Sequence, residues 1–112
     1  MKTKRPWGFY TVINKGKGFK VKVVEVLPFK RLSLQKHNFR SEHWVVVQGT
    51  ATITNGKKVF TLKENQSTYI PIKGTHRIEN KHKTLLKIVE IQCGDLLKEC
   101  DIIRLEDDHG RK

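Results

Sequence analysis

Hydrophobic residues alternate with polar ones or form short β-branched runs along most of the chain, and helical spacing has little support before Asp95. Glycine, proline and asparagine interrupt these segments every roughly 8–12 residues. This pattern is typical of antiparallel sheets and predicts a barrel or a sandwich. The predicted strands cover residues 8–13, 19–26, 31–37, 43–48, 50–54, 57–62, 67–70, 76–80, 85–92 and 102–105.

The segment TATITNGKKVFTL contains the clearest predicted hairpin. Asn55 and Gly56 would supply the two positive-φ residues of a type I′ turn between its alternating strands. Pro28 and Pro71 mark two further sharp connections at strand ends, because proline cannot donate a hydrogen bond to a β-ladder.

Polar residues occupy every second position before the segment SEHWVVVQG. On a strand, Ser33, Gln35 and His37 share one face, while Leu32 and Leu34 occupy the other. If the leucines pack into the core, the polar side chains are exposed to solvent. In a barrel, the polar face lines the mouth instead, where a small barrel has room for one ligand.

Gln35 and His37 are followed by two more potential metal ligands. A hairpin through residues 38–41 would return Glu42 to His37, and His76 follows a turn that contains proline and glycine. These oxygen and nitrogen donors suit zinc, manganese or iron(II) and leave coordination positions open. A single histidine is more often a surface residue, so the hypothesis depends on the joint spacing.

The chain of 112 residues is long enough for one small domain. It carries 23 Lys and Arg against 11 Asp and Glu, a formal charge of +12. This excess indicates nucleic acid, a small anionic substrate or only a solvated lysine-rich surface. A nucleic-acid-binding barrel would interleave aromatic and basic residues on one face, and the sequence shows no such pattern.

Cys93 and Cys100 lack the second pair that a zinc ribbon requires, so we expect reduced thiols in a cytoplasmic protein. No segment approaches the ~20 apolar residues of a membrane-spanning helix. We therefore expect neither export nor membrane insertion.

The spacing of the candidate ligands resembles that of the two cupin motifs. The first, G(x)5HxH(x)3–4E(x)6G, is matched by Gln35, His37, Glu42 and Gly49, with glutamine replacing the first histidine. The second, G(x)5PxG(x)2H(x)3N, is matched by Pro71, His76 and Asn80. The chain departs from the usual pattern at Phe29, at the turn PIKGTH, at Asn38 and Phe39, and at His109.

A closer resemblance, over about residues 5–111, is carried by RPWGFY, LSLQKH, SEHWVVVQGTATITNG, ENQSTYIP, THRIEN and DIIRLEDDHGR. These segments resemble the cupin domain of type II mannose-6-phosphate isomerase, which in bacteria often follows a mannose-1-phosphate guanylyltransferase domain. The resemblance implies an all-β double-stranded β-helix, or jelly-roll barrel. We expect one domain over residues 1–112, with a core of about 5–106 and a poorly packed tail at 107–112.

The resemblance also implies interconversion of mannose 6-phosphate and fructose 6-phosphate, in nucleotide-sugar and polysaccharide synthesis. One divalent metal ion, zinc first and manganese, iron or cobalt as alternatives, would be bound by Gln35, His37, Glu42 and His76. The phosphate candidates are Arg104, preferred for its forked guanidinium, then Lys22 and Lys36. The proton-transfer base is left open between Glu90, His43 and Lys22.

The expected partners are a sugar phosphate and, by family analogy, a second copy in a homodimer, with no nucleic acid or membrane. The alternative function is a non-catalytic cupin that binds a sugar phosphate or nucleotide sugar. Such a protein would act beside a separate mannose-1-phosphate guanylyltransferase chain, since this sequence lacks that enzyme's glycine-rich nucleotide loop.

Overall fold

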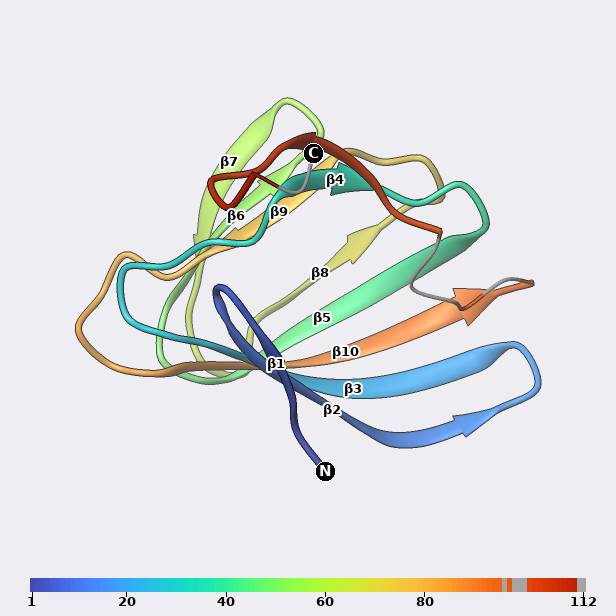
Figure 1. The fold of residues 1–112 in the computed structure, drawn as a ribbon, viewed down its shortest axis with the longest axis horizontal. Coiled ribbons are helices and arrows are strands. Elements are labelled where there is room, and N and C mark those ends of the chain that lie inside the picture. Colours follow the sequence, from blue (N-terminus) through green and yellow to red (C-terminus); the bar gives the residue numbers. More distant parts are fainter. Residues whose placement is uncertain (96, 98–100, 111–112) are drawn as a thin grey trace.

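The computed structural model describes residues 1–95, 97 and 101–110, which form antiparallel strands in two facing sheets (Figure 1). The large sheet contains, in spatial order, β1 (Thr3–Arg5), β2 (Gly8–Gly16), β3 (Phe19–Val26), β10 (Leu86–Gly94), β5 (Arg40–Gln48) and β8 (Ser67–Ile70). The small sheet contains β11 (Ile103–Glu106), β4 (Leu34–Lys36), β9 (His76–Glu79), β6 (Ala51–Asn55) and β7 (Lys58–Leu62).

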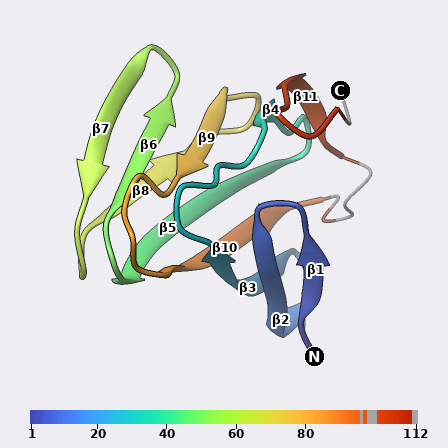
Figure 2. The same cartoon turned by 60° about the vertical axis from the view of Figure 1, so that its left-hand side comes forward.

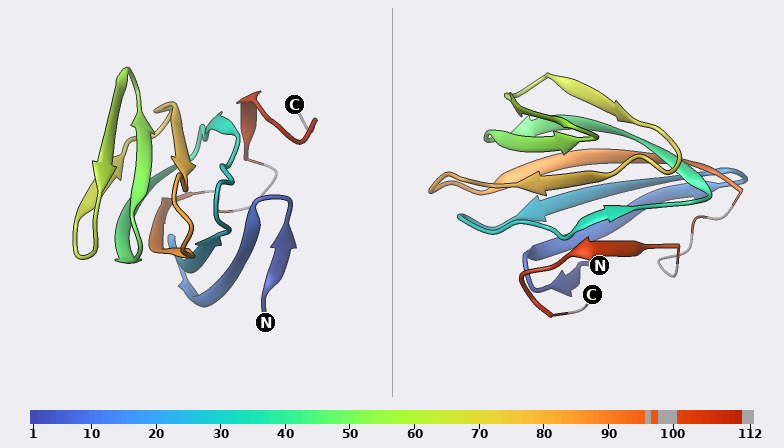
Figure 3. Two further views of the ribbon diagram at one scale, coloured as in Figure 1. Left: turned by 90° about the vertical axis from the view of Figure 1, so that its left-hand side faces the viewer. Right: turned by 90° about the horizontal axis from the view of Figure 1, so that it is seen from above.

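The two sheets form facing layers that enclose the core (Figure 2). The hairpin of β6 and β7 lies at one side of the molecule. Strand β11 of the small sheet and strand β1 of the large sheet lie together at the other side (Figure 3). The all-β prediction is therefore confirmed, and both ends of the described chain contribute strands to the same side of the barrel.

On the inward face of β3, β5 and β10, the buried residues are apolar along one half of the strand and mostly polar along the other half. In β10, the buried residues Leu86 and Ile88 are followed by the buried Glu90 and Gln92. The register aligns the same division across β3 and β5, because Ile88 pairs with Val24 and Val46 whereas Glu90 pairs with Lys22 and Trp44. One end of the barrel is thus a hydrophobic core and the other is a polar interior.

Several predicted strands have different bounds in the structure. The predicted strand 31–37 is reduced to β4, since Arg31 makes only an isolated bridge to Glu79. Strand β5 begins at Arg40, three residues before its predicted start, and β1 was not predicted. The short β1 precedes Pro6 and carries three polar residues, so its sequence contains no apolar alternation.

The predicted hairpin through residues 38–41 is wrong. Strand β4 pairs with β9 and β11 in the small sheet, whereas β5 pairs with β10 and β8 in the large sheet. The connecting loop therefore crosses from one sheet to the other, and this crossing carries His37 into the barrel interior.

The predicted type I′ turn at Asn55 and Gly56 is also wrong. Asn55 pairs with Lys58, so Gly56 and Lys57 form the turn, and φ is positive at Gly56 but not at Asn55. The Asn55 amide instead donates hydrogen bonds to Thr68 and to the carbonyl of Tyr69. A tertiary contact with β8 thus determines the conformation of a residue that favours turns.

The C-terminal tail is held more firmly than its composition predicts. Arg31 donates two hydrogen bonds to the Asp108 carboxylate, at 2.6 and 2.8 Å, and Arg77 pairs with Glu106 at 2.7 Å. Residues 111 and 112 lie outside the described residues, as does Cys100, while Cys93 is an exposed free thiol. Among the described residues, no helix is long and apolar enough to cross a membrane.

Two departures from the cupin motifs keep a backbone conformation that favours glycine. Phe29 replaces the first glycine of the first motif and Lys73 replaces the glycine of PxG, with φ angles of 60° and 66°. The Lys73 amide donates to the carbonyl of His37 at 2.7 Å. The left-handed conformation is therefore held by a contact beside the candidate site, although it costs a non-glycine residue roughly 1–2 kcal/mol.

We expect Lys73→Gly to raise the free energy of unfolding by up to about 1 kcal/mol, because relief of this strain exceeds the entropy cost of glycine. The matched control, Lys58→Gly in β7, lies where φ is not positive and should lower stability by about 0.5–1 kcal/mol. Urea denaturation measures both values. An equal decrease in the free energy of unfolding of the two variants would contradict the prediction.

Candidate metal centre

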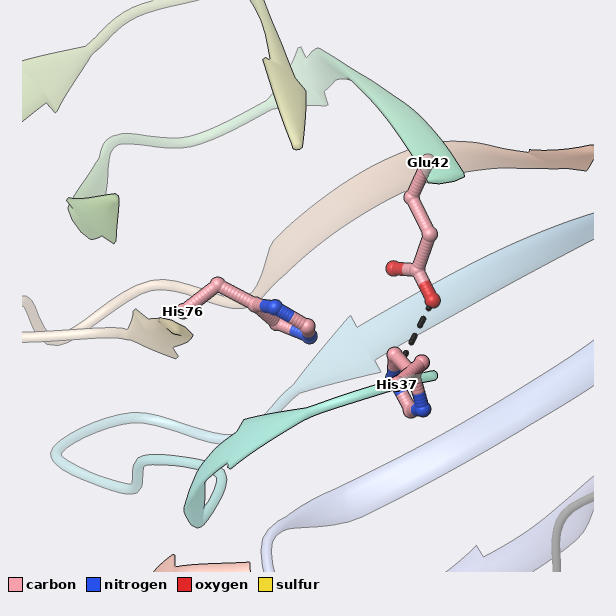
Figure 4. A group of neighbouring side chains, drawn as sticks. All are labelled: His37, Glu42 and His76. Carbon is pink, nitrogen blue, oxygen red and sulfur yellow. Dashed lines mark ion pairs between the residues drawn. The ribbon is translucent and has the colours of Figure 1, made fainter. Parts of the chain in front are cut away.

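Three potential metal ligands meet in the polar half of the barrel (Figure 4). His37 follows β4, Glu42 lies on β5 and His76 begins β9, and one ligand atom from each lies within 4.8 Å of the others. The Nε2 atom of His37 is 3.2 Å from Oε2 of Glu42. All three side chains are at most 2% exposed, so the cluster is shielded from bulk water.

Backbone carbonyls orient both imidazoles. The Nδ1 atom of His37 is hydrogen-bonded to the carbonyl of Asp101, and Nδ1 of His76 to that of Gly74 at 2.9 Å. A carbonyl can only accept, so each Nδ1 carries the hydrogen and each Nε2 keeps its lone pair. The buried Nε2 of His76 has no hydrogen-bond partner within the described part of the chain. This arrangement is usual for histidines that bind metals.

Both imidazoles are neutral near pH 7. Burial, together with the charge of Arg40, lowers the pKa of His37 to about 4. Burial is also the main reason that the pKa of His76 is lowered to about 4. A metal ion would therefore displace no proton from either ring at neutral pH.

Gln35 lies beside the three clustered residues. It pairs with His76 across β4 and β9, it is buried, and its Oε1 accepts a hydrogen bond from Ser33 at 3.0 Å. An amide oxygen has a second lone pair. Two nitrogens, a carboxylate and an amide oxygen fit a divalent ion of the zinc, manganese or iron(II) type, and the partnerless Nε2 of His76 supports that fit.

Arg40, which is not among the predicted site residues, contacts the cluster directly. Its Nε donates to Oε2 of Glu42 at 2.9 Å, and its terminal nitrogen donates to Nε2 of His37 at 3.0 Å. Every second residue of β5 faces the interior, which places Arg40 on the same face as Glu42 and Trp44. This parity could have identified Arg40, but the predicted strand began too late to include it.

Glu90 forms a second buried carboxyl group beside Glu42. The indole nitrogen of Trp44 donates to both, at 2.8 Å to Glu42 and 3.1 Å to Glu90, and Gln92 donates to Glu90 at 2.9 Å. Burial, together with the neighbouring charge of Glu42, raises the pKa of Glu90 to about 8. Such a carboxyl group can exchange a proton near neutral pH.

A cavity of about 50 Å³ adjoins this cluster and gathers basic side chains. It is lined by Arg5, Trp7, Tyr10, Lys22, Val24, Leu32, Ser33, Gln35, Arg40, Glu90, Ile102 and Arg104. The buried Lys22 lies 4.2 Å from the centre of the Tyr10 ring, and Arg5 donates to the Tyr10 hydroxyl at 3.3 Å. Four cationic side chains therefore face one small space.

The cavity is much smaller than the about 300 Å³ of an ordinary small-molecule pocket. The side chains that line the cavity would therefore have to rearrange before a sugar phosphate could bind.

The structure brings together most, but not all, of the predicted site residues. Gln35, Lys22, Glu90 and Arg104 line the cavity beside the three clustered ligands. Lys36 is not among the cavity residues, because it lies on the face of β4 opposite Gln35. His43 is exposed on the outer face of β5, where its ring lies 4.7 Å from that of Tyr69 at a tilt of 46°.

The fold and the buried histidine–carboxylate cluster define a cupin barrel with a candidate metal centre. The cupin domain of Cnp3 from Schizosaccharomyces pombe superposes with a TM-score of 0.74 at 17% identity, covering 78% of this chain and 64% of that chain. This likeness confirms the fold. Residues 1–107 match the family described as "Mannose-6-phosphate isomerase C-terminal", and the chain belongs to that family.

Known relatives are considerably longer proteins. The alginate biosynthesis protein AlgA of Pseudomonas aeruginosa is 54% identical over 107 residues, which are 96% of this chain and 22% of that protein. The mannose-1-phosphate guanylyltransferase RfbM of Salmonella typhimurium is 46% identical over 106 residues, 95% of this chain and 22% of that protein. The chain thus spans less than a quarter of these relatives.

The buried Glu90 gives a test of the site's electrostatics. Its pKa is raised from 4.5 to about 8 in the folded protein, so the folded state binds more protons and the free energy of unfolding falls as pH rises through this window. His37 and His76 have lowered pKa values, so their contribution is present above pH 6.5 and is lost only as pH falls toward 4.

Between pH 6.5 and 8, EDTA-treated wild-type protein should therefore lose about 1.5 kcal/mol of stability through Glu90. We expect Glu90→Gln to remove this loss, while the exposed Glu64→Gln control retains it. Urea unfolding at several pH values measures the slope. Parallel slopes for wild type and Glu90→Gln would contradict the assignment.

Proposed function

We propose that this chain is a metal-dependent mannose-6-phosphate isomerase that acts in the cytoplasm, in nucleotide-sugar and polysaccharide synthesis. The observation that carries the proposal is the buried cluster of His37, Glu42 and His76 beside the proton-exchanging carboxyl of Glu90. Family membership supports the choice of reaction. The name of the alginate biosynthesis relative supports the polysaccharide context.

Isomerisation of an aldose to a ketose moves a proton from C2 to C1 through an enediolate-like intermediate. A divalent ion bound by Gln35, His37, Glu42 and His76 would polarise the carbonyl oxygen and stabilise its developing negative charge. We propose zinc as the resident ion, with manganese, iron or cobalt as alternatives, on the basis of the mixed nitrogen and oxygen donors.

Glu90 is the base that the geometry favours among the three candidates. It lines the cavity, is buried, and its pKa lies close to the working pH of a cytoplasmic enzyme. Lys22 also lines the cavity, and its ammonium group lies over the Tyr10 ring. His43 is on the outer face of the large sheet, so we do not assign it a catalytic role.

Arg104 and Lys22 are the proposed phosphate ligands. Both line the cavity with Arg5, and a guanidinium can bind two phosphate oxygens. Arg104 pairs with Gln35 across β11 and β4, so an anion at Arg104 would lie near the proposed metal ligands. Lys36 has no part in this proposal, because it does not face the cavity.

The second candidate is a non-catalytic cupin that binds a sugar phosphate or a nucleotide sugar. The close contacts of Arg40 with two of the proposed metal ligands favour it. Such a protein would act beside a separate mannose-1-phosphate guanylyltransferase. Metal binding without turnover would identify this case.

An isomerase assay on mannose 6-phosphate, with metal analysis of the same sample, tests the proposal. We expect one bound metal ion per chain, and loss of at least about 100-fold in turnover with metal for His37→Ala, because the lost charge stabilisation is central to the reaction. The matched control His43→Ala should keep wild-type activity, since its side chain lies outside the cavity.

The same assay distinguishes the remaining outcomes. Arg104→Met should mainly raise KM if it binds phosphate. The isomerase proposal would be wrong if wild-type protein contained no metal. It would also be wrong if His37→Ala and His43→Ala lost turnover of mannose 6-phosphate equally.

We further propose that the chain forms a homodimer through the outer face of the large sheet. Half-buried apolar side chains recur on this face along β3, β10 and β5, and β8 adds the exposed Tyr69; the apolar residues include Val21, Val23, Val45, Val89 and Ile91. Lys87 is the one lysine among the outward positions of these strands. Two copies that each carry a charge of +12 can approach here with little repulsion.

Strands β3, β5 and β10 are about 27–31 Å long and β8 about 14 Å, and at a spacing of about 4.8 Å they present roughly 500 Å² per copy. Two copies would therefore bury about the 1,000 Å² that a specific interface requires. A second copy fits this face better than an acidic partner, because an acidic partner would bind where the lysines are.

We expect Val89→Asp, at the centre of this face, to convert a dimer into a folded monomer, because each buried aspartate would lack a partner. The control Val59→Asp changes an exposed valine of β7 in the small sheet and should leave the dimer intact. Sedimentation velocity measures both masses, and circular dichroism checks folding. A monomeric wild type, or a dimeric Val89→Asp variant, would contradict the proposal.

A further inference from the structure

Nε2 of His37 offers a single lone pair, which already accepts a hydrogen bond. Nδ1 carries the ring hydrogen, because it is bonded to the carbonyl of Asp101, so Nε2 is the only acceptor of this neutral imidazole. Arg40 donates to that atom at 3.0 Å. A metal ion coordinated by Nε2 needs the same lone pair, so this hydrogen bond and the coordinate bond exclude one another.

Arg40 and a metal ion would also compete for Glu42. The Nε atom of Arg40 donates to Oε2 of Glu42 at 2.9 Å, and this oxygen is also the one that lies 3.2 Å from His37. One guanidinium therefore bridges two of the three clustered ligand atoms. The Arg40 guanidinium thus supplies a positive charge between His37 and Glu42.

Metal binding must therefore change the environment of Arg40. Its side chain is only 5% exposed, and it would lose its contact with His37 while a second positive charge arrived beside it. Two positive charges that lie close together in a buried site repel each other strongly. Arg40 also lines the basic cavity together with Arg5, Lys22 and Arg104, so an anion in that cavity can compensate the guanidinium.

We propose that Arg40 couples metal binding to anion binding: it competes with the metal ion for His37 and Glu42, and a tetrahedral oxyanion in the basic cavity favours its release. Because coupling between two ligands is reciprocal, the metal ion then raises anion affinity by the same factor. The inference rests on the proposed metal site but not on isomerisation.

Calorimetric titration of Zn²⁺ into EDTA-treated, dialysed protein tests the coupling, with and without sodium sulfate at constant ionic strength set by sodium perchlorate. Sulfate is the anion probe because its zinc salt is soluble. For wild type, we expect sulfate to lower the zinc Kd by about tenfold, within the usual range of such couplings. Arg40→Met should bind zinc about tenfold more tightly than wild type without sulfate, and sulfate should then have little effect.

Arg31→Met is the matched control, because Arg31 pairs with Asp108 at the surface and contacts none of the clustered ligands. It should keep the wild-type zinc affinity and the wild-type response to sulfate. If Arg40→Met does not fold, Arg40→Lys replaces it: one ammonium group cannot reproduce the guanidinium fork, so its zinc Kd without sulfate should also fall below that of wild type.

An unchanged zinc Kd in the folded Arg40 variant, or an equal effect of sulfate on wild type and variant, would overturn the inference. Failure of wild type to bind zinc at all would overturn both the inference and the metal site. Intact coupling in a protein that does not turn over mannose 6-phosphate would support the inference while removing the isomerase proposal.

Discussion

The need to compensate buried charge governs the interior of this barrel. Glu42 and Glu90 lie in the same protein interior as a hydrophobic core, where an unpaired charge is strongly destabilising. The indole of Trp44 donates to both carboxyl groups, and Arg40 donates to Glu42. Burial keeps the neighbouring imidazoles neutral and keeps Glu90 protonated to unusually high pH. The groups that compensate buried charge in the polar half of the barrel therefore also make it suitable for binding a cation and for proton transfer.

Departures from the cupin motifs are accommodated without loss of the backbone that supports the cluster. Phe29 and Lys73 adopt the left-handed conformation of the glycines that they replace, and the amide of Lys73 contacts the carbonyl of His37. At Asn38 and Phe39, both backbone amides donate to the carboxylate of Asp101 at 3.0 Å. Their side chains are thus free to vary, because the loop is held through its backbone.

The site is assembled from elements along the whole described chain. Arg5 comes from β1, His37 from the crossing between the sheets, Glu42 from β5, Glu90 from β10 and Arg104 from β11. The chain spans only 22% of the relatives AlgA and RfbM, yet all the side chains of the candidate metal centre belong to this segment.

The sequence by itself determined which residues share a face, because alternation on a strand is a local property. It correctly predicted an all-β fold, and its motif spacing selected the three residues that the structure brings within 4.8 Å. It could not predict that β4 and β5 lie in different sheets, since pairing depends on contacts far apart in the sequence. Only the tertiary structure decided that Arg40 contacts His37 and Glu42, and that Arg5 joins the basic cavity. Lys36 and His43 face away from the cavity because alternation places them opposite Gln35 and Glu42. The physical reason is that strand register and sheet packing, rather than local propensity, set the distances between side chains.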